Sequence, residues 1–231
     1  MRYRLVLITH GDAPALDRVV EAFEQNVTPA PAERLAIIDG SGSRLPVGVW
    51  NVSPSLEQRG FCEATRAGWT AGAESSFDYV FWLENDFLIT RTVDLALLAA
   101  VLDANSQLAQ MQLMRNAVNE QERAAGGLYE SRPGQYESRV WREPFVRPAS
   151  YAVGVPIPGR EHHWLRHRAY LTTNPCLMRR DFMAENPWPD YPEQCEGRFG
   201  IDLVAAGFSF GVWGDGQPWC EHVGIRDGFG Y

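Results

Sequence analysis

Short apolar runs alternate with helix-length stretches along the first 115 residues of the chain. The runs that we interpret as strands are Arg4–Thr9, Leu35–Ile38, Tyr79–Leu83 and Leu108–Met114. The stretches between them that we interpret as helices are Pro14–Gln25, Pro54–Ala73 and Val93–Asp103. Strands and helices that alternate in this way predict an α/β fold, with a mostly parallel sheet flanked by helices on both faces.

Two of these runs end in polar turns, where open α/β sheets bind their ligands. Asp39-Gly40-Ser41-Gly42 follows the second run, and Glu84-Asn85-Asp86 follows the third. Side chains one residue apart in extended backbone point to the same side, so Glu84 and Asp86 can form a carboxylate pair. Such a pair can hold a hard divalent ion that bridges two phosphates. The alternative is an acidic turn or helix cap.

The alternation stops between residues 116 and 168, a segment that is rich in Gly, Pro, Arg and aromatic residues. A long irregular segment inside a compact domain usually covers or shapes a site. Order returns at Tyr170–Leu177. A helix is expected from Glu193 or Glu196 to Ala206, and a strand from Phe208 to Trp213.

Charge is unevenly distributed along the chain. The net charge is −8, which argues against a general nucleic-acid coat protein, and every cationic side chain other than histidine is arginine. The segment Ser131–Arg180 carries nine arginines against three glutamates, a net charge of +6, interleaved with aromatic residues. A basic segment on an acidic body indicates a local anionic partner. The alternative is that these arginines pair with the acidic body.

The four cysteines show neither CxxC pairing nor zinc-like spacing, so we expect reduced, partly buried thiols. The longest purely apolar stretch, Leu95–Leu102, is far shorter than the roughly 20 residues that span a bilayer. The apolar run near the start of the sequence, Leu5–Ile8, is too short for a secretory signal and is interpreted as the first strand. These features predict a cytoplasmic protein without a membrane partner.

The segment Phe77–Asp86 resembles the strand and DxD motif of nucleotide-sugar-dependent glycosyltransferases of the GT-A fold, with Glu84 in place of the first Asp. Three further segments follow in the order of that family. They are Leu35–Ser43, similar to the second-strand turn; Gly60–Gly72, similar to the helix before the metal strand; and Phe199–Phe208, similar to the helix that supplies the base. The resemblance covers roughly residues 3–115 and 170–224. It implies a GT-A (Rossmann-like) fold.

The resemblance also implies a set of site residues. Asp86 and His222, with Glu84, would hold Mn²⁺ or Mg²⁺, although a lone late histidine can also be structural. Asp202 would be the catalytic base, but the family's acidic doublet is here Ile201-Asp202 with a single acid, so Glu196 is the alternative. The residues expected to bind the donor are Thr9, His10, Gly11, Asp39, Arg66, Glu84 and Asn85.

The implied activity is the transfer of a sugar, with inversion, from a nucleotide-sugar donor, a UDP-sugar, to an acceptor hydroxyl. The expected organisation is a single domain over residues 1–231: a donor-nucleotide half (1–115), an acceptor-side segment (116–169) and a catalytic half (170–231). The basic segment makes the chain similar to phage enzymes that glycosylate hydroxymethylated pyrimidines in DNA, which predicts 5-hydroxymethylcytosine in DNA as acceptor and the host cytoplasm as location. The alternatives are a glycan, lipid or protein acceptor, a nucleotidyltransferase, and a nucleotide-sugar-binding module without turnover.

Overall fold

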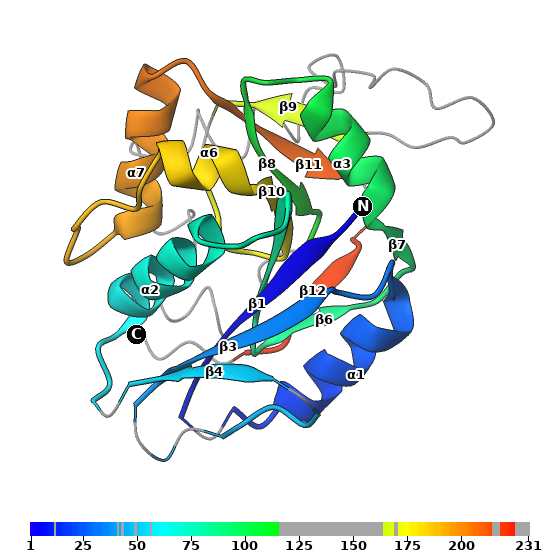
Figure 1. Cartoon of the computed structure of the whole chain (residues 1–231), viewed down its shortest axis with the longest axis vertical. Helices are drawn as coiled ribbons and strands as arrows, with labels where there is room; N and C mark the ends of the chain where they lie inside the picture. Colours follow the sequence, from blue (N-terminus) through cyan, green and yellow to red (C-terminus); the bar gives the residue numbers. More distant parts are fainter. Residues whose placement is uncertain are drawn as a thin grey trace.

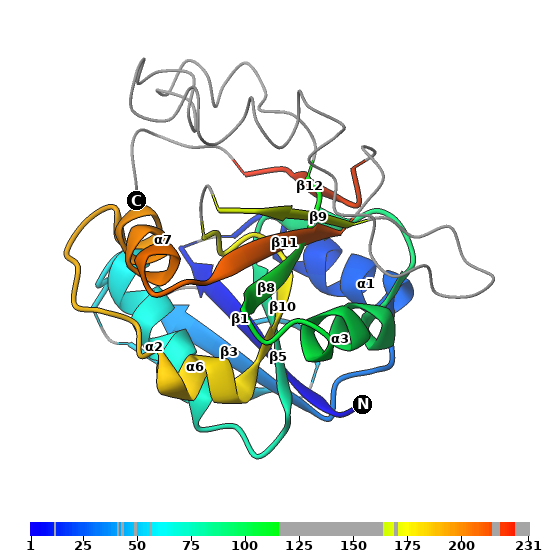
Figure 2. The same ribbon diagram turned by 90° about the horizontal axis from the view of Figure 1, so that it is seen from above.

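A computed structural model describes most of the chain outside the irregular segment and the C-terminus. The described residues are 1–11, 13–40, 42, 44–48, 50–55, 57–115, 164–168, 171–213 and 218–224. Within them, a twisted eight-stranded sheet lies between two layers of helices (Figures 1 and 2). Residues 116–163, which make up most of the predicted acceptor-side segment 116–169 and much of the basic segment Ser131–Arg180, lie outside the described residues.

The main sheet has the strand order β4-β3-β1-β5-β10-β8-β11-β9. Its strands are β1 (Tyr3–His10), β3 (Glu33–Asp39), β4 (Asn51–Pro54), β5 (Tyr79–Glu84), β8 (Leu108–Leu113), β9 (Trp164–His167), β10 (Cys176–Arg179) and β11 (Ser209–Trp213). β10 and β9 run antiparallel to their neighbours, and the other pairs are parallel. The prediction of an α/β fold with a mostly parallel sheet is therefore confirmed.

Two small sheets and five helices complete the described structure. The small sheets pair β2 (Val27–Thr28) with β7 (Val93–Asp94), and β6 (Phe87–Ile89) with β12 (Cys220–His222). The described helices are α1 (Leu16–Asn26), α2 (Phe61–Ala73), α3 (Leu95–Asp103), α6 (Arg180–Glu185) and α7 (Cys195–Ala205).

The alternation of side chains along the buried strands divides the core into two layers. Leu5 and Leu7 of β1 point to the face that α1 and α3 cover, whereas Val6 and Ile8 point to the face covered by α2, α6 and α7 (Figure 2). Because both faces are covered, the central strands are apolar throughout rather than alternating apolar with polar residues. This explains why the strand runs were recognisable as continuous apolar stretches.

Helix α2 begins later than the sequence pattern predicted. Of the predicted helix Pro54–Ala73, Pro54 is the last residue of strand β4, and the helix itself starts only at Phe61. The residue before it, Gly60, has a φ of 86°, a conformation that glycine adopts without steric cost and that a helix interior does not contain. A second difference lies at the end of the irregular segment, where Trp164–His167 forms the edge strand β9.

The prediction of four reduced cysteines is wrong for two of them. Cys62, in the first turn of α2, forms a disulfide with Cys195, in the first turn of α7, with a Cα–Cα distance of 5.8 Å. The pairing connects positions 133 residues apart, which sequence spacing does not reveal. Cys176 and Cys220 are buried free thiols, as predicted.

Within the described residues, no helix has both the length and the apolar character needed to cross a bilayer.

Candidate functional site

Three parallel strands end side by side and bring their polar ends to one edge of the sheet. The register pairs His10 of β1 with Asp39 of β3, and Ile8 of β1 with Glu84 of β5. A pocket opens at this edge. Its lining residues are Ile8, His10, Asp39, Gln58, Phe61, Ala64, Glu84 and Asn85. Four of the residues predicted to bind a donor, His10, Asp39, Glu84 and Asn85, therefore lie around one pocket, although His10 and Asn85 are 75 positions apart in the chain.

Asp39 is buried and held by two backbone donors. Its Oδ1 accepts a hydrogen bond from the Arg59 amide at 2.7 Å, and its Oδ2 accepts one from the Gly60 amide at 2.9 Å. These contacts fix the loop that leads into α2 against the end of β3, so that Phe61 and Ala64 form one wall of the pocket. Carboxylates that accept backbone N–H groups are held in one orientation, which suits recognition of a ligand's own donors.

Asn85 joins the ends of β5 and β1. Its amide N–H donates to the Ile8 carbonyl at 3.1 Å, and its Nδ2 donates to Thr9 Oγ1 at 3.3 Å and to the His10 carbonyl at 3.4 Å. Thr9 is fully buried, so it supports the pocket from behind. Gly11 follows with a φ of 55°, and its carbonyl accepts from the Arg44 amide.

Asp86 and His222 meet beyond the end of β5. His222 Nε2 lies 2.9 Å from Asp86 Oδ2, and the His222 side chain is almost fully buried. The antiparallel pairing of β12 with β6 sets His222 opposite Phe87, whose ring centroid lies 4.8 Å from that of the imidazole. The Val223 amide donates to the Asp86 carbonyl at 2.8 Å, so the backbone of both segments is fixed as well.

The atoms around this pair fit a divalent cation. Asp86 Oδ1 is buried without a hydrogen-bond partner among the described residues. A Cβ atom on Gly224 would lie 2.1 Å from Asp86 Oδ2 and 2.9 Å from His222 Nε2, so the glycine leaves the space beside both ligating atoms open. One carboxylate and one neutral imidazole suit Mn²⁺ or Mg²⁺ when a ligand supplies further oxygens. Among the described residues, no third His, Cys, Asp or Glu completes a cluster with them.

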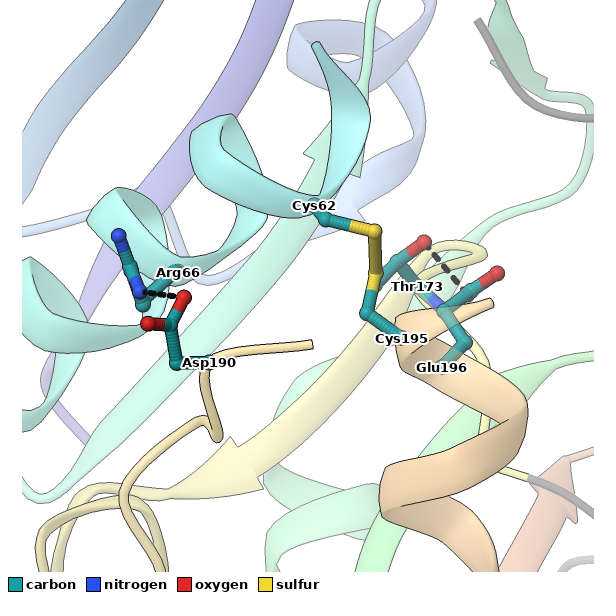
Figure 3. The surroundings of a disulfide bond; sticks show 6 residues. All are labelled: Cys62, Arg66, Thr173, Asp190, Cys195 and Glu196. Carbon is teal, nitrogen blue, oxygen red and sulfur yellow. Dashed lines mark hydrogen bonds and ion pairs between the residues drawn. A yellow bond between two sulfur atoms is a disulfide. The ribbon is translucent and has the colours of Figure 1, made fainter. Parts of the chain in front are cut away.

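Glu196, in the first turn of α7, is oriented toward the middle of the sheet. Its Oε1 accepts hydrogen bonds from the Thr173 amide at 2.5 Å and from Thr173 Oγ1 at 2.7 Å (Figure 3). Burial raises the pKa of the nearby Cys176 thiol, and the carboxylates of Glu84 and Glu196 raise that pKa further. Glu84 and Glu196 therefore lie near the same buried thiol, although they come from β5 and α7.

Asp202 lies elsewhere on the same helix. It is exposed, and its Oδ2 accepts a hydrogen bond from the Tyr191 hydroxyl, which raises the pKa of that phenol. Three residues predicted to bind the donor, Thr9, Gly11 and Arg66, are outside the pocket lining, and the Arg66 guanidinium forms ion pairs with Glu63 and Asp190.

The sequence did not predict four residues of the pocket lining: Ile8 at the end of β1, and Gln58, Phe61 and Ala64 before and within the start of α2. The available signal was Gly60, because a glycine before a helix-like stretch marks a point where the backbone turns. A helix predicted to start after Gly60 rather than at Pro54 would have placed Phe61 and Ala64 in its first turn, beside the strand ends.

This topology and this site define the class of fold: the chain has the GT-A fold of nucleotide-sugar glycosyltransferases, as predicted. The structure is similar to that of GalNAc-T7 crystallised with UDP, GalNAc and Mn²⁺, with a TM-score of 0.66 at 15% identity over 99% of this chain and 45% of that chain. It is also similar to TarS of S. aureus, with a TM-score of 0.55 at 11% identity over 97% of this chain and 37% of the other. The chain thus spans less than half the length of either protein. No family model and no curated protein sequence matches it.

Proposed function

We propose that the protein is a metal-dependent glycosyltransferase that transfers a sugar from a nucleotide-sugar donor to an acceptor hydroxyl. The observation that carries this proposal is the Asp86–His222 pair, which lies beyond the end of β5, the strand whose last residue lines the polar pocket. The similar GalNAc-T7 structure contains UDP, GalNAc and Mn²⁺, which supports a UDP-sugar as donor and Mn²⁺ or Mg²⁺ as cofactor.

In this proposal the pocket binds the nucleoside. Asp39 and Glu84 supply carboxylate oxygens, which accept hydrogen bonds from the N–H of uracil and from ribose hydroxyls. Phe61 provides an aromatic surface for the base, and His10 and Asn85 complete the polar lining. Arg66 is not part of this proposed donor site, because its guanidinium is paired with Glu63 and Asp190 and does not line the pocket.

Asp86 and His222 would hold the cation. When bound there, a divalent ion would stabilise the negative charge that develops on the leaving diphosphate. The buried Oδ1 of Asp86 would then gain the partner that it does not find among the described residues.

Glu196 is the base that the geometry supports best. Thr173 holds its carboxylate with two hydrogen bonds, and Glu84, two residues after Trp82 in β5, points to the sheet face that α7 covers. The acceptor O–H would give its proton to Glu196 while the oxygen attacks the anomeric carbon and the bond from that carbon to the diphosphate breaks. A single base without a protein nucleophile gives inversion of the anomeric configuration.

The proposed acceptor remains DNA that contains 5-hydroxymethylcytosine, on the basis of the +6 charge of the Ser131–Arg180 segment. Two of its described arginines already have protein partners: Arg166 donates to Asn105, and Arg179 donates to the carbonyls of Leu102 and Ser106. The proposal therefore depends on the other arginines of the segment.

The proposal is tested by incubating the protein with a panel of UDP- and other nucleotide sugars, Mn²⁺, and DNA with or without hydroxymethylcytosine. We expect release of UDP and a sugar-modified acceptor. Release of sugar 1-phosphate instead, with UMP transferred to the acceptor, would identify a nucleotidyltransferase. Binding of nucleotide sugar without any turnover would identify a binding module.

A further inference from the structure

Three side chains along one face of α2 bind this helix to the segment that runs from α6 to the start of α7. Cys62, Arg66 and Trp69 are four and seven positions apart, a spacing that places them on the same helix face. Cys62 is bonded to Cys195, Arg66 forms an ion pair with Asp190, and Trp69 Nε1 donates to the carbonyls of Met183 and Asn186 at 3.1 and 2.9 Å. Figure 3 shows the first two of these ties side by side.

The disulfide is the tie that lies closest to the proposed chemistry. Cys195 immediately precedes Glu196 in the first turn of α7. Cys62 immediately follows Phe61, a residue of the pocket wall, in the first turn of α2. One covalent bond therefore connects the wall of the proposed donor pocket to the turn that carries the proposed base (Figure 3).

The start of α7 has no side-chain cap. Its N-cap residue, Gln194, has a φ of 51° and makes no side-chain capping hydrogen bond. An N-cap side chain normally satisfies one of the free amides of the first turn and fixes where a helix begins. At α7 the position of the first turn is instead fixed by the Cys62–Cys195 bond on one side and by the Thr173–Glu196 hydrogen bonds on the other.

Beyond the first turn, packing holds the helix independently of the disulfide. Phe199 of α7 packs on Trp69 and Trp188, with ring centroids 5.4 and 5.0 Å apart, and Trp69 also packs on Phe182. These contacts are buried. Loss of the disulfide would therefore loosen residues 194–197 without releasing the helix from the core.

We propose that the Cys62–Cys195 disulfide is a redox-sensitive positioning element that holds Glu196 within reach of the acceptor. The inference rests on the proposed function and adds a form of control to it. In the oxidised protein the base is fixed. A dithiol that supplies two electrons and two protons converts the bond to two thiols and is itself oxidised to a disulfide, and the first turn of α7 then moves away from its catalytic position.

Activity is compared in the oxidised protein and in protein reduced with dithiothreitol, which is removed before Mn²⁺ is added. The measured reaction is release of UDP from UDP-GalNAc or from whichever UDP-sugar the panel selects. Reduction should lower kcat by roughly ten- to a hundredfold, the scale expected when a catalytic group is misplaced by about 1 Å. KM for the donor and the Kd for UDP should stay within about twofold, because the pocket residues are retained. Reoxidation should restore kcat.

Four variants separate the disulfide from its surroundings. Cys62→Ser and Cys195→Ser should each show the low kcat of the reduced protein, and the double variant should be insensitive to dithiothreitol. Asp190→Asn removes the more distal and largely exposed tie on the same face of α2 and should leave kcat within about twofold. A reduced wild type that keeps its kcat, or a double variant that still responds to reductant, would overturn the inference.

A readout independent of activity distinguishes this inference from the proposed function. Amide hydrogen exchange should quicken at residues 195–198 on reduction and stay unchanged in the strands β1 and β5. Equal exchange in both redox states would overturn the positioning role. If the oxidised wild type neither binds UDP with Mn²⁺ nor releases UDP from any donor, the proposed function and the catalytic part of the inference are both overturned. The hydrogen-exchange result would still decide whether the disulfide holds the start of α7.

Discussion

His222 Nε2 lies 2.9 Å from Asp86 Oδ2, although 136 positions separate the two residues in the chain. The contact exists because β12 returns along β6 and places His222 opposite Phe87, directly after the Asp86 turn. Two segments that lie far apart in the chain thus build one ligand pair.

Replacement of Asp86 by Ala should abolish Mn²⁺-dependent binding of UDP while the protein stays folded. The substitution removes the carboxylate that lies 2.9 Å from His222 Nε2 and leaves the main sheet intact. Isothermal titration with UDP, with and without Mn²⁺, measures the effect, and circular dichroism checks the fold. Unchanged dependence on Mn²⁺ in this variant would contradict the assignment of the metal site.

Replacement of Gly224 by Ala should weaken Mn²⁺ binding although no ligand is removed. The added Cβ would lie 2.1 Å from Asp86 Oδ2, so the carboxylate or the backbone would have to shift. We expect a loss of affinity of roughly tenfold, the lower end of the range for groups that orient a metal's ligands. The control is Glu221→Gln, an exposed position of β12 that neighbours His222 and points to the opposite side, which should leave Mn²⁺ affinity unchanged. Equal Mn²⁺ affinity in Gly224→Ala and wild type would show that the cation is held elsewhere.

Much of the donor side could be predicted from sequence because it depends on local patterns. The buried strands β1, β3 and β5 are continuous apolar runs, and the polar residues that follow them meet at one edge of the sheet because the strands are parallel. His10, Asp39, Glu84 and Asn85 could therefore be placed together without a structure. The wall formed by Phe61 could not, because it depends on where α2 begins.

The catalytic side was harder to predict because it depends on the rotation of one helix. Glu196 and Asp202 are both on α7, and sequence similarity alone left both open as the base. The buried residues Cys195, Phe199, Gly200 and Leu203 define the face of α7 that packs into the core. Glu196 falls within the arc of that face and Asp202 outside it, so helical spacing contained the signal. The disulfide contained none, because four cysteines allow three pairings and the spacing favours none of them.

Replacement of Gly68 by Ala tests the packing of α2 on the sheet. A Cβ at Gly68 would lie 2.8 Å from Cη2 of Trp82 and 2.9 Å from Cδ1 of Ile8, both of them buried. Overpacking of this kind should lower the free energy of unfolding by about 1–3 kcal/mol, measured by urea denaturation. Thr70→Ala, on the exposed face of the same helix, should change it by less than about 0.5 kcal/mol. Equal stability of both variants would mean that α2 does not pack this closely on β1 and β5.

Binding of DNA should depend steeply on salt if the Ser131–Arg180 segment contacts phosphates. Affinity for duplex DNA is expected to fall with a log–log slope of about −0.9 for each phosphate contacted. Replacement of Arg139 and Arg142 should make this slope shallower and leave the Kd for UDP unchanged. Affinity that is independent of salt, or equal transfer to a neutral glycan, would exclude DNA as the acceptor.

The choice between the two candidate bases is decided by a pair of isosteric substitutions. Glu196→Gln should lower kcat by at least about a hundredfold, the low end for removal of a general base, because an amide cannot accept the proton of the acceptor hydroxyl. Donor affinity should hardly change, since Glu196 lies outside the pocket lining. Asp202→Asn should keep kcat within about twofold, because its carboxylate is exposed and bonded to the Tyr191 hydroxyl. The converse result, a large loss in Asp202→Asn and none in Glu196→Gln, would assign the base to Asp202 and would require α7 to turn about its axis when substrate binds.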